Sequence, residues 1–121
     1  MGGMSSVQPF FRYFKMPGVQ HCWGTAMGGP WAIGGAGQAG ATSSAGWSVK
    51  GFEDPQHDAM LALIDWVEKG KAVDSIIATM WRNQLDPSTG VVRQRPLCPY
   101  PKKQSYNGRG DVNKPDSWSC K

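Results

Sequence analysis

Apolar side chains occupy both alternating faces of one short stretch near the start of the chain. Residues 10–15 read "FFRYFK", with Phe10 and Phe14 on one face and Phe11 and Tyr13 on the other. A strand that is apolar on both faces fits an inner strand of a parallel sheet better than an edge strand. Pro-Gly follows shortly after and ends the pattern. We therefore predict a buried strand over residues 10–15.

A helical pattern begins in the middle of the chain. The spacing i, i+3, i+4, i+7 is met by apolar residues at Met60, Leu63, Ile64 and Val67. This spacing places them on one face, which we expect to lie in the core. Asp54 suits the N-cap and Pro55 the first helical position, whereas Gly70 suits the position just after the helix. The sequence thus predicts a helix over residues 55–69.

The rest of the chain contains few regular patterns. Residues 75–81, "SIIATMW", are β-branched and apolar and predict a second strand. Residues 16–51 are predicted to be a loop, and its part from residue 23 holds more than half of the 16 glycines. We expect a coil-rich tail over residues 91–121, opened by one short strand at 91–95. The alternation of strand and helix favours an α/β fold.

Composition narrows the possible partners. The 121 residues suit one small domain, and 40% hydrophobic with 18% charged residues is usual for a folded protein. The net charge of +4 has only a mild cluster of bases, at Arg93, Arg95, Lys102 and Lys103. No basic stripe interleaves with aromatic residues, so we expect no nucleic-acid binding. No apolar run is long enough to cross a membrane, and the first residues lack the pattern of a signal peptide.

Three cysteines leave one without a partner in the chain. Cys98 and Cys120 lie in segments predicted to be coil, which suits a disulfide in a secreted protein. Cys22 then has two interpretations. It is either a buried free thiol or a cysteine whose partner lies outside this chain.

Three motifs are weak. Residues 35–40, "GAGQAG", match the dinucleotide-binding pattern, but no amphipathic helix follows, so a nucleotide site is disfavoured. Residues 109–111, "RGD", fit an ordinary solvated turn. His57 with Asp58 and Asp65 lacks a second histidine or cysteine at ligand spacing, and His57 is expected at the surface. We therefore predict no metal or other cofactor in this chain.

His21 is the strongest candidate for chemistry. It lies in a loop just after the predicted strand at 10–15, between Pro-Gly and further glycines. This is where α/β-hydrolases place their catalytic base, on a loop after a late strand. A structural histidine is the alternative that position alone favours.

Three segments resemble the tannase and feruloyl esterase family of secreted serine esterases. They are "FFRYFKMPGVQHCWG", "DAMLALIDWVEKGKAVDSIIAT" and "TGVVRQRPLCPYPKKQSYNGRGDVNKPDSWSC". The last carries the most specific block, Arg-Pro-Leu-Cys-Pro-Tyr-Pro, and a cysteine near the terminus. Together they cover most of the chain.

The resemblance implies an α/β-hydrolase fold with a large lid and a Ser-Asp-His triad. His21 is then the triad base. Cys22 is the cysteine that bonds a partner beside the serine. The implied substrate is an aromatic carboxylic ester, such as a feruloyl polysaccharide or a gallate ester. Calcium, which the family often carries in the lid, is not expected in this segment.

The chain lacks the other parts of such a site. In this fold the serine and the acid precede the histidine, yet the first acid here is Glu53 and no G-x-S-x-G precedes His21. We therefore expect the C-terminal portion of an α/β-hydrolase, incomplete as a domain, inactive alone, and aggregated or molten. The alternative is a non-catalytic secreted module that binds phenolics or polysaccharide through Trp23, Trp31 or Trp47.

Overall fold

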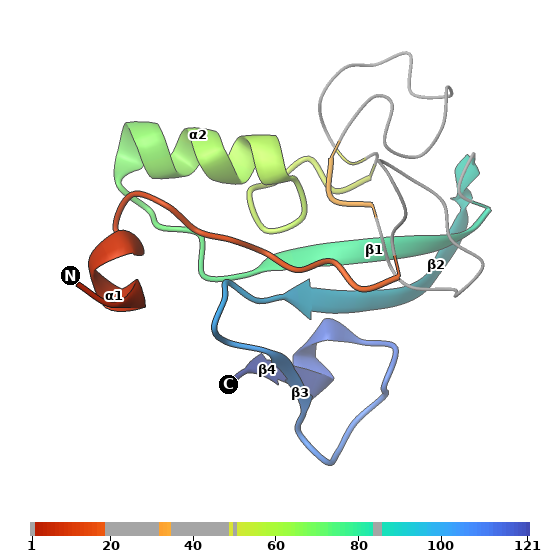
Figure 1. The fold of residues 1–121 in the computed structure, drawn as a ribbon. Helices are drawn as coiled ribbons and strands as arrows, with labels where there is room; N and C mark the ends of the chain where they lie inside the picture. The colour runs from red at the N-terminus through yellow and green to blue at the C-terminus, as the bar shows by residue number, and fades with distance from the viewer. Residues whose placement is uncertain (1, 19–31, 35–48, 50, 84–85) are drawn as a thin grey trace.

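The chain has mixed helix and strand content (Figure 1). The structure is a computed structural model that describes residues 2–18, 32–34, 49, 51–83 and 86–121. Its elements, in chain order, are α1 (Met4–Val7), α2 (Ala59–Lys69), β1 (Ile76–Asn83), β2 (Asp86–Leu97), β3 (Gln104–Tyr106), the 3-10 helix η1 (Pro115–Ser117) and β4 (Trp118–Cys120).

The strands that the structure describes pair into two antiparallel sheets of two strands each. β1 pairs with β2, from Ile76 opposite Leu97 to Asn83 opposite Asp86, with register shifts around Trp81. The predicted strand at 75–81 is therefore longer and shifted, and the strand expected at 91–95 extends over 86–97. Single-sequence patterns miss most of β2 because its first half is exposed and polar, so that pairing with β1 defines it.

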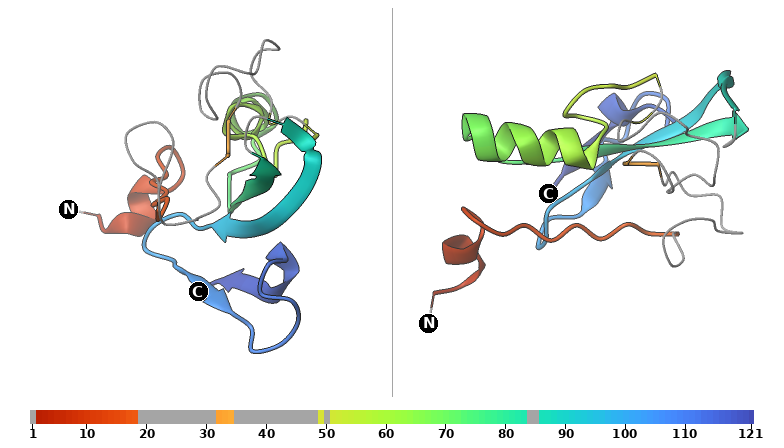
Figure 2. Two further views of the ribbon diagram at one scale, coloured as in Figure 1. Left: turned by 90° about the vertical axis from the view of Figure 1, so that its right-hand side faces the viewer. Right: turned by 90° about the horizontal axis from the view of Figure 1, so that it is seen from above.

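The tail contains a second small sheet where coil was expected. β3 pairs with β4, with Gln104 opposite Cys120 and Tyr106 opposite Trp118. All strand pairs that the structure describes are antiparallel, so the expected parallel sheet is not formed by these residues. In Figures 1 and 2, α2 lies on one side of the β1–β2 hairpin and the β3–β4 sheet lies on the other.

The helix begins later than predicted. Asp54 instead caps a turn, in which its Oδ1 accepts hydrogen bonds from the backbone amides of Gln56 and His57. The N-cap of α2 is Asp58, whose carboxylate accepts from the amides of residues 60 and 61. The end agrees with the sequence, because Gly70 adopts the left-handed conformation with φ of 66° and closes the helix. Two aspartates four residues apart both suit a cap, and the second one takes that role.

Residues 10–15 do not form the predicted inner strand in this chain. The segment is extended, but the only ladder contact that it makes with other described residues is a bridge between Phe14 and Pro99. Side chains at 12, 14 and 16 are partly covered, whereas those at 11, 13 and 15 are exposed. Phe10, which precedes this alternation, is 76% exposed. One face lacks cover because the described residues provide no further strand or helix to pack against it.

Among the described residues, the buried apolar side chains form two small clusters. Ala32, Val49 and Trp81 form one, beside the ring of Phe52. The other contains Ile76, Ala78 and Leu97, with several partly buried residues around it. α2 contributes little to either cluster. Its buried residue, Ala62, belongs to neither, and Ala59 packs against the second from a partly buried position.

Most of the face of α2 that the sequence assigned to the core is open to solvent, and only Ile64 of its four residues is partly buried. About half of the Met60 and Leu63 side chains is exposed, and Val67 is 76% exposed. The prediction that this face lies in the core is therefore wrong for this chain. The apolar spacing is real, but the described residues provide nothing that covers it.

Candidate active-site loop and a neighbouring pocket

The two residues predicted to carry chemistry, His21 and Cys22, lie outside the described residues. The same is true of "GAGQAG" at 35–40 and of Trp23, Trp31 and Trp47. These predictions therefore stay predictions. What the structure describes is how the chain is held on either side of the His21 loop.

Both flanks of this loop are attached to the β1–β2 hairpin and the turn that follows it. On the N-terminal side, the backbone oxygen of Tyr13 accepts a hydrogen bond of 2.7 Å from the amide of Tyr100. On the C-terminal side, Ala32 exchanges two backbone hydrogen bonds with Thr79 of β1, at 3.0 and 3.1 Å. Thr79 is fully buried and also accepts from the side chain of Gln94. The residues on both sides of the His21 loop are thus hydrogen-bonded to the β1–β2 hairpin and to the turn that follows it.

The tail is stapled by the predicted disulfide. Cys98, just after β2, is bonded to Cys120 in β4, with Cα atoms 5.5 Å apart. Cys98 is buried. This pairing agrees with the one expected from the position of the two cysteines. Because the two described cysteines are bonded to each other, neither is available as a partner for Cys22.

His57 is not the surface residue expected from the sequence. Its side chain is 12% exposed, and its Nδ1 lies 2.9 Å from the carboxylate of Asp54. Its ring stacks on Phe52 with centroids 4.3 Å apart. Burial tends to raise the pKa of Asp54, but hydrogen bonds from His57 and Gln56 outweigh it and lower this pKa below 3.8. The spacing Asp54-x-x-His57 is the sequence signal that could have indicated the pair.

The other proposed metal ligands have structural roles. Asp58 caps α2, and Asp65 forms an ion pair of 2.5 Å with Lys69 one turn later. In the described part of the chain, no three His, Cys, Asp or Glu side chains come together as a metal site. The "RGD" residues lie in a bend, where Asp111 accepts from the amide of Asn113.

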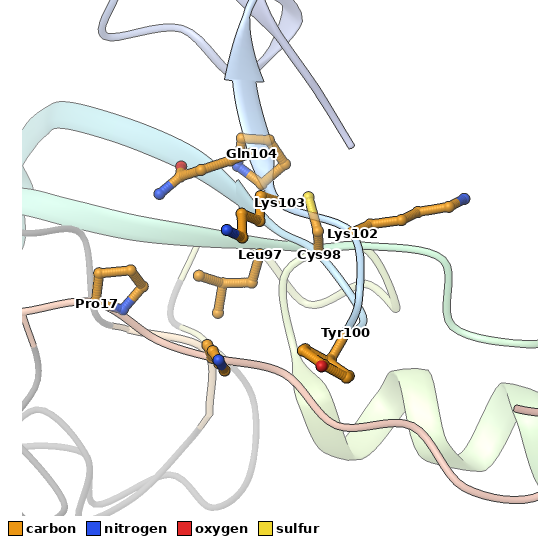
Figure 3. Close-up of a pocket in the computed structure, with 9 residues that line it drawn as sticks. Pro17, Leu97, Cys98, Tyr100, Lys102, Lys103 and Gln104 are labelled. Carbon is orange, nitrogen blue, oxygen red and sulfur yellow. The ribbon is translucent and has the colours of Figure 1, made fainter. Parts of the chain in front are cut away.

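A pocket of about 310 Å³ lies where the predicted strand segment meets the stapled tail (Figure 3). It combines apolar and basic side chains. The residues that line it are Lys15, Pro17, Pro96, Leu97, Cys98, Tyr100, Lys102, Lys103 and Gln104. Sequence analysis had treated the lysines near 102 as a solvated face and had not connected them with Lys15.

Comparison with known proteins places this chain among esterases. It is 35% identical over 117 residues to an uncharacterized esterase of Xanthomonas campestris pv. campestris, covering 97% of this chain and 18% of that protein. It is 32% identical over 116 residues to feruloyl esterase B of Aspergillus niger, covering 96% of this chain and 19% of that protein. The chain therefore spans about a fifth of the length of these relatives.

Solved structures agree with this assignment. The crystal structure of feruloyl esterase B from Aspergillus oryzae matches with a TM-score of 0.71 and 30% identity, covering 98% of this chain and 20% of that one. A second esterase from Aspergillus oryzae matches with a TM-score of 0.69 and 27% identity, covering 96% and 20%. The family described as "Tannase and feruloyl esterase" matches residues 1–121. The chain belongs to this family.

Among the described residues, no helix has the length and apolar character needed to cross a bilayer. The longest, α2, has 11 residues.

Proposed function

We propose that this chain is the part of a feruloyl-esterase-type carboxylic ester hydrolase that supplies the catalytic base, His21. The observation that carries the proposal is the family match over residues 1–121, which covers only about a fifth of the matched esterases. We further propose that the complete fold is an α/β-hydrolase of which this chain is the C-terminal portion. We propose that the enzyme acts on aromatic carboxylic esters, as the names of the relatives suggest, and that it does so outside the cell.

In the proposed reaction, a serine from the rest of the fold attacks the ester carbonyl. Neutral His21 takes the serine proton and passes it to the leaving alcohol, which leaves an acyl-enzyme. His21 then takes a proton from water, which attacks the acyl-enzyme, and the proton returns to the serine as the aromatic acid departs. Cys22 is proposed to bond a cysteine beside that serine and so to hold the two loops together.

Two open surfaces support the idea that the chain is one part of a larger fold. The first is the segment at 11–16, with exposed side chains on one face; its described backbone hydrogen bonds are one from Phe11 back to Val7 and one from Tyr100 to Tyr13. The second is the exposed apolar face of α2 around Leu63 and Val67. Strand edges and apolar helix faces of this kind are normally paired or covered. We propose that the remaining sheet of the esterase packs on both.

The test is a grafted esterase, in which this chain replaces the aligned segment of Aspergillus niger feruloyl esterase B. We expect it to hydrolyse methyl ferulate. His21→Ala should lower kcat by about four orders of magnitude or more, because a triad works as a unit. The matched control is His57→Gln, which removes the other histidine and should keep turnover.

Two results would contradict the proposal. One is a grafted esterase that is monomeric and has its disulfide formed but shows no turnover. The other is turnover that survives His21→Ala, measured in a preparation free of host esterase.

A further inference from the structure

An Asn-Gly step lies where β3 ends and the loop of the tail begins. Asn107 and Gly108 follow Tyr106, the last residue of β3, and both are exposed. In Figures 1 and 2, the β3–β4 sheet lies on the side of the β1–β2 hairpin away from α2. Neither residue belongs to the two surfaces on which we place the rest of the esterase. The step is therefore open to solvent and to chemistry in the complete fold as well.

Two hydrogen bonds hold the Asn107 side chain in one orientation. Its Oδ1 accepts from the hydroxyl of Ser119 in β4 at 2.8 Å, and its Nδ2 donates to the backbone oxygen of Asp116 at 3.3 Å. A hydroxyl that donates to an amide oxygen draws electrons from the carbonyl carbon and stabilises negative charge that develops on the oxygen. The side-chain carbonyl carbon of Asn107, Cγ, is thus activated toward a nucleophile.

The nearest nucleophile along the chain is the backbone nitrogen of Gly108. In the part of the chain that the structure describes, its N–H donates no hydrogen bond. A Cβ atom at this position would meet no other atom within 4 Å. Glycine has no side chain to hinder attack, and its backbone rotates most freely. The nitrogen is therefore free to turn toward the Asn107 side chain.

Asn113, in the same loop, provides a contrast. The amide that follows it, that of Lys114, donates a hydrogen bond of 3.0 Å to the backbone oxygen of Asp111. Asn113 is also partly covered, and the residue after it carries a long side chain. The corresponding attack is therefore blocked at Asn113 and open at Asn107.

We propose that Asn107 is a site of spontaneous deamidation in the folded enzyme, with Ser119 as the activating donor. A base in the solvent takes the amide proton of Gly108, and the nitrogen bonds to Cγ of Asn107. Negative charge collects on Oδ1, beside the Ser119 hydroxyl. The bond from Cγ to Nδ2 then breaks, and Nδ2 leaves as ammonia after it takes a proton from water. Water opens the resulting cyclic imide to aspartate or isoaspartate, so the net reaction consumes one water and releases one ammonia.

The product should weaken the end of the tail sheet. A carboxylate oxygen takes the place of the Nδ2 donor and faces the backbone oxygen of Asp116, which repels it. Isoaspartate also adds a carbon to the backbone beside the hydrogen bond of 2.8 Å from the Asn107 amide to Ser117. Because the reaction is irreversible, converted molecules accumulate with the age of the enzyme.

Peptide mapping of aged protein tests the proposal. The grafted esterase, checked to be monomeric with its disulfide formed, is kept at neutral pH and sampled over time. Mass spectrometry follows the conversion of amide to acid, and isoaspartate methyltransferase labels the isoaspartate product. We expect Asn107 to convert at least about tenfold faster than Asn113, because only Asn107 precedes an unhindered and unbonded amide. Amide hydrogen exchange in β3 and β4 should be about threefold or more faster in converted than in unconverted protein.

Substitutions separate the folded-state reaction from ordinary chain chemistry. Ser119→Ala should slow the conversion by about three- to tenfold, because the donor to Oδ1 is lost. The matched control is Ser105→Ala, which removes the hydroxyl of the residue paired with Ser119 and should leave the rate unchanged. Gly108→Ala hinders the nitrogen and should slow the reaction by about tenfold or more, although its φ of 79° makes alanine strained there.

Two results would overturn the proposal. One is conversion of Asn107 that is no faster than that of Asn113. The other is a rate that Ser119→Ala leaves unchanged or raises, since the reaction would then not depend on the folded tail. Peptide mapping requires folded protein and no turnover. An inactive grafted esterase would therefore remove the proposed function without touching this site, and an active one with stable Asn107 would do the reverse.

Discussion

Arg12 joins the extended N-terminal segment to the link that follows α2. Its Nη1 donates to the backbone oxygen of Val73 and to Asp74 Oδ1, both at 2.6 Å. The guanidinium also lies 5.5 Å from the centroid of the Trp66 ring. The Arg12 side chain, which is 12% exposed, thus joins two segments that lie about 60 residues apart in the sequence.

We predict that Arg12→Met weakens the attachment of this segment. The loss of a charged hydrogen bond to a backbone carbonyl and of a cation–π contact costs about 1–2 kcal/mol. Asp74 is 81% exposed, so Asp74→Asn should cost less than about 0.5 kcal/mol. The cost of each substitution can be measured from amide hydrogen exchange of residues 10–16 in the grafted esterase. A larger effect of Asp74→Asn than of Arg12→Met would contradict this ranking.

The disulfide should account for much of the stability of the tail. Cys98 and Cys120 are separated by 22 residues. Closing a loop of that length contributes roughly 3 kcal/mol by the chain-entropy estimate. Non-reducing peptide mapping of the oxidised chain should find these two linked and Cys22 free. A link from Cys22 to either of them would show that the assignment is wrong.

Asp54 should titrate at low pH. Its pKa is lowered from 3.8 in the folded chain, since hydrogen bonds from His57 and Gln56 outweigh the effect of burial. A lowered folded pKa means that the charged carboxylate adds stability above its unfolded pKa and that this stability is lost as the pH falls through the folded value. Carboxyl-carbon NMR of the grafted esterase should place the Asp54 midpoint below 3.8, and Asp54→Asn should lack this pH dependence. A midpoint above 3.8 would contradict the assignment.

Sequence patterns predicted elements where the signal is local. The end of α2 at Gly70 depends on a left-handed residue, and the strand at 75–81 on β-branched residues, so both could be located. β2 could not, because its polar first half becomes a strand only by pairing with β1. The site was only partly predictable for the same reason. The pocket joins Lys15 to Lys103 through the bridge of Phe14 to Pro99, and no local pattern encodes that contact.

The faces of the elements illustrate a second limit. The apolar spacing at Leu63 and Val67 predicts a face that is covered, yet in the described structure that face is open. The same holds for Phe11 and Tyr13. Apolar periodicity shows which face of a helix or strand needs to be covered. Whether that face is covered depends on residues far away in the sequence, which the periodicity does not reveal.

The chain alone should show no esterase activity. It has no acid before His21 and no G-x-S-x-G, so His21 has no serine proton to take. Its rate with methyl ferulate or methyl gallate should not exceed that of free imidazole at equal concentration. Saturable turnover that disappears on His21→Ala would reveal a nucleophile within this chain.

The last prediction concerns self-association. Phe10, Phe11 and Tyr13 are each more than half exposed on a segment whose backbone makes one described ladder contact. The α2 face adds Met60, Leu63 and Val67. Apolar surface of this extent next to an open strand edge favours aggregation. The chain expressed alone should therefore elute as oligomers or aggregates, or lack a cooperative unfolding transition.

Substitutions should separate the cause from general instability. Phe11→Ser with Val67→Lys should shift the lone chain toward monomer in light scattering, because these side chains are exposed and their loss removes little packing. The matched control is Val112→Lys, at an exposed apolar position that is 46% accessible and lies in the tail, away from both surfaces. It should leave the association unchanged. In the grafted esterase we expect the opposite effect: Phe11→Ser with Val67→Lys should destabilise the enzyme, because we propose that the remaining sheet covers both side chains there. A wild-type chain that is monomeric with a sharp thermal transition would contradict the prediction and would identify this segment as a domain that folds by itself.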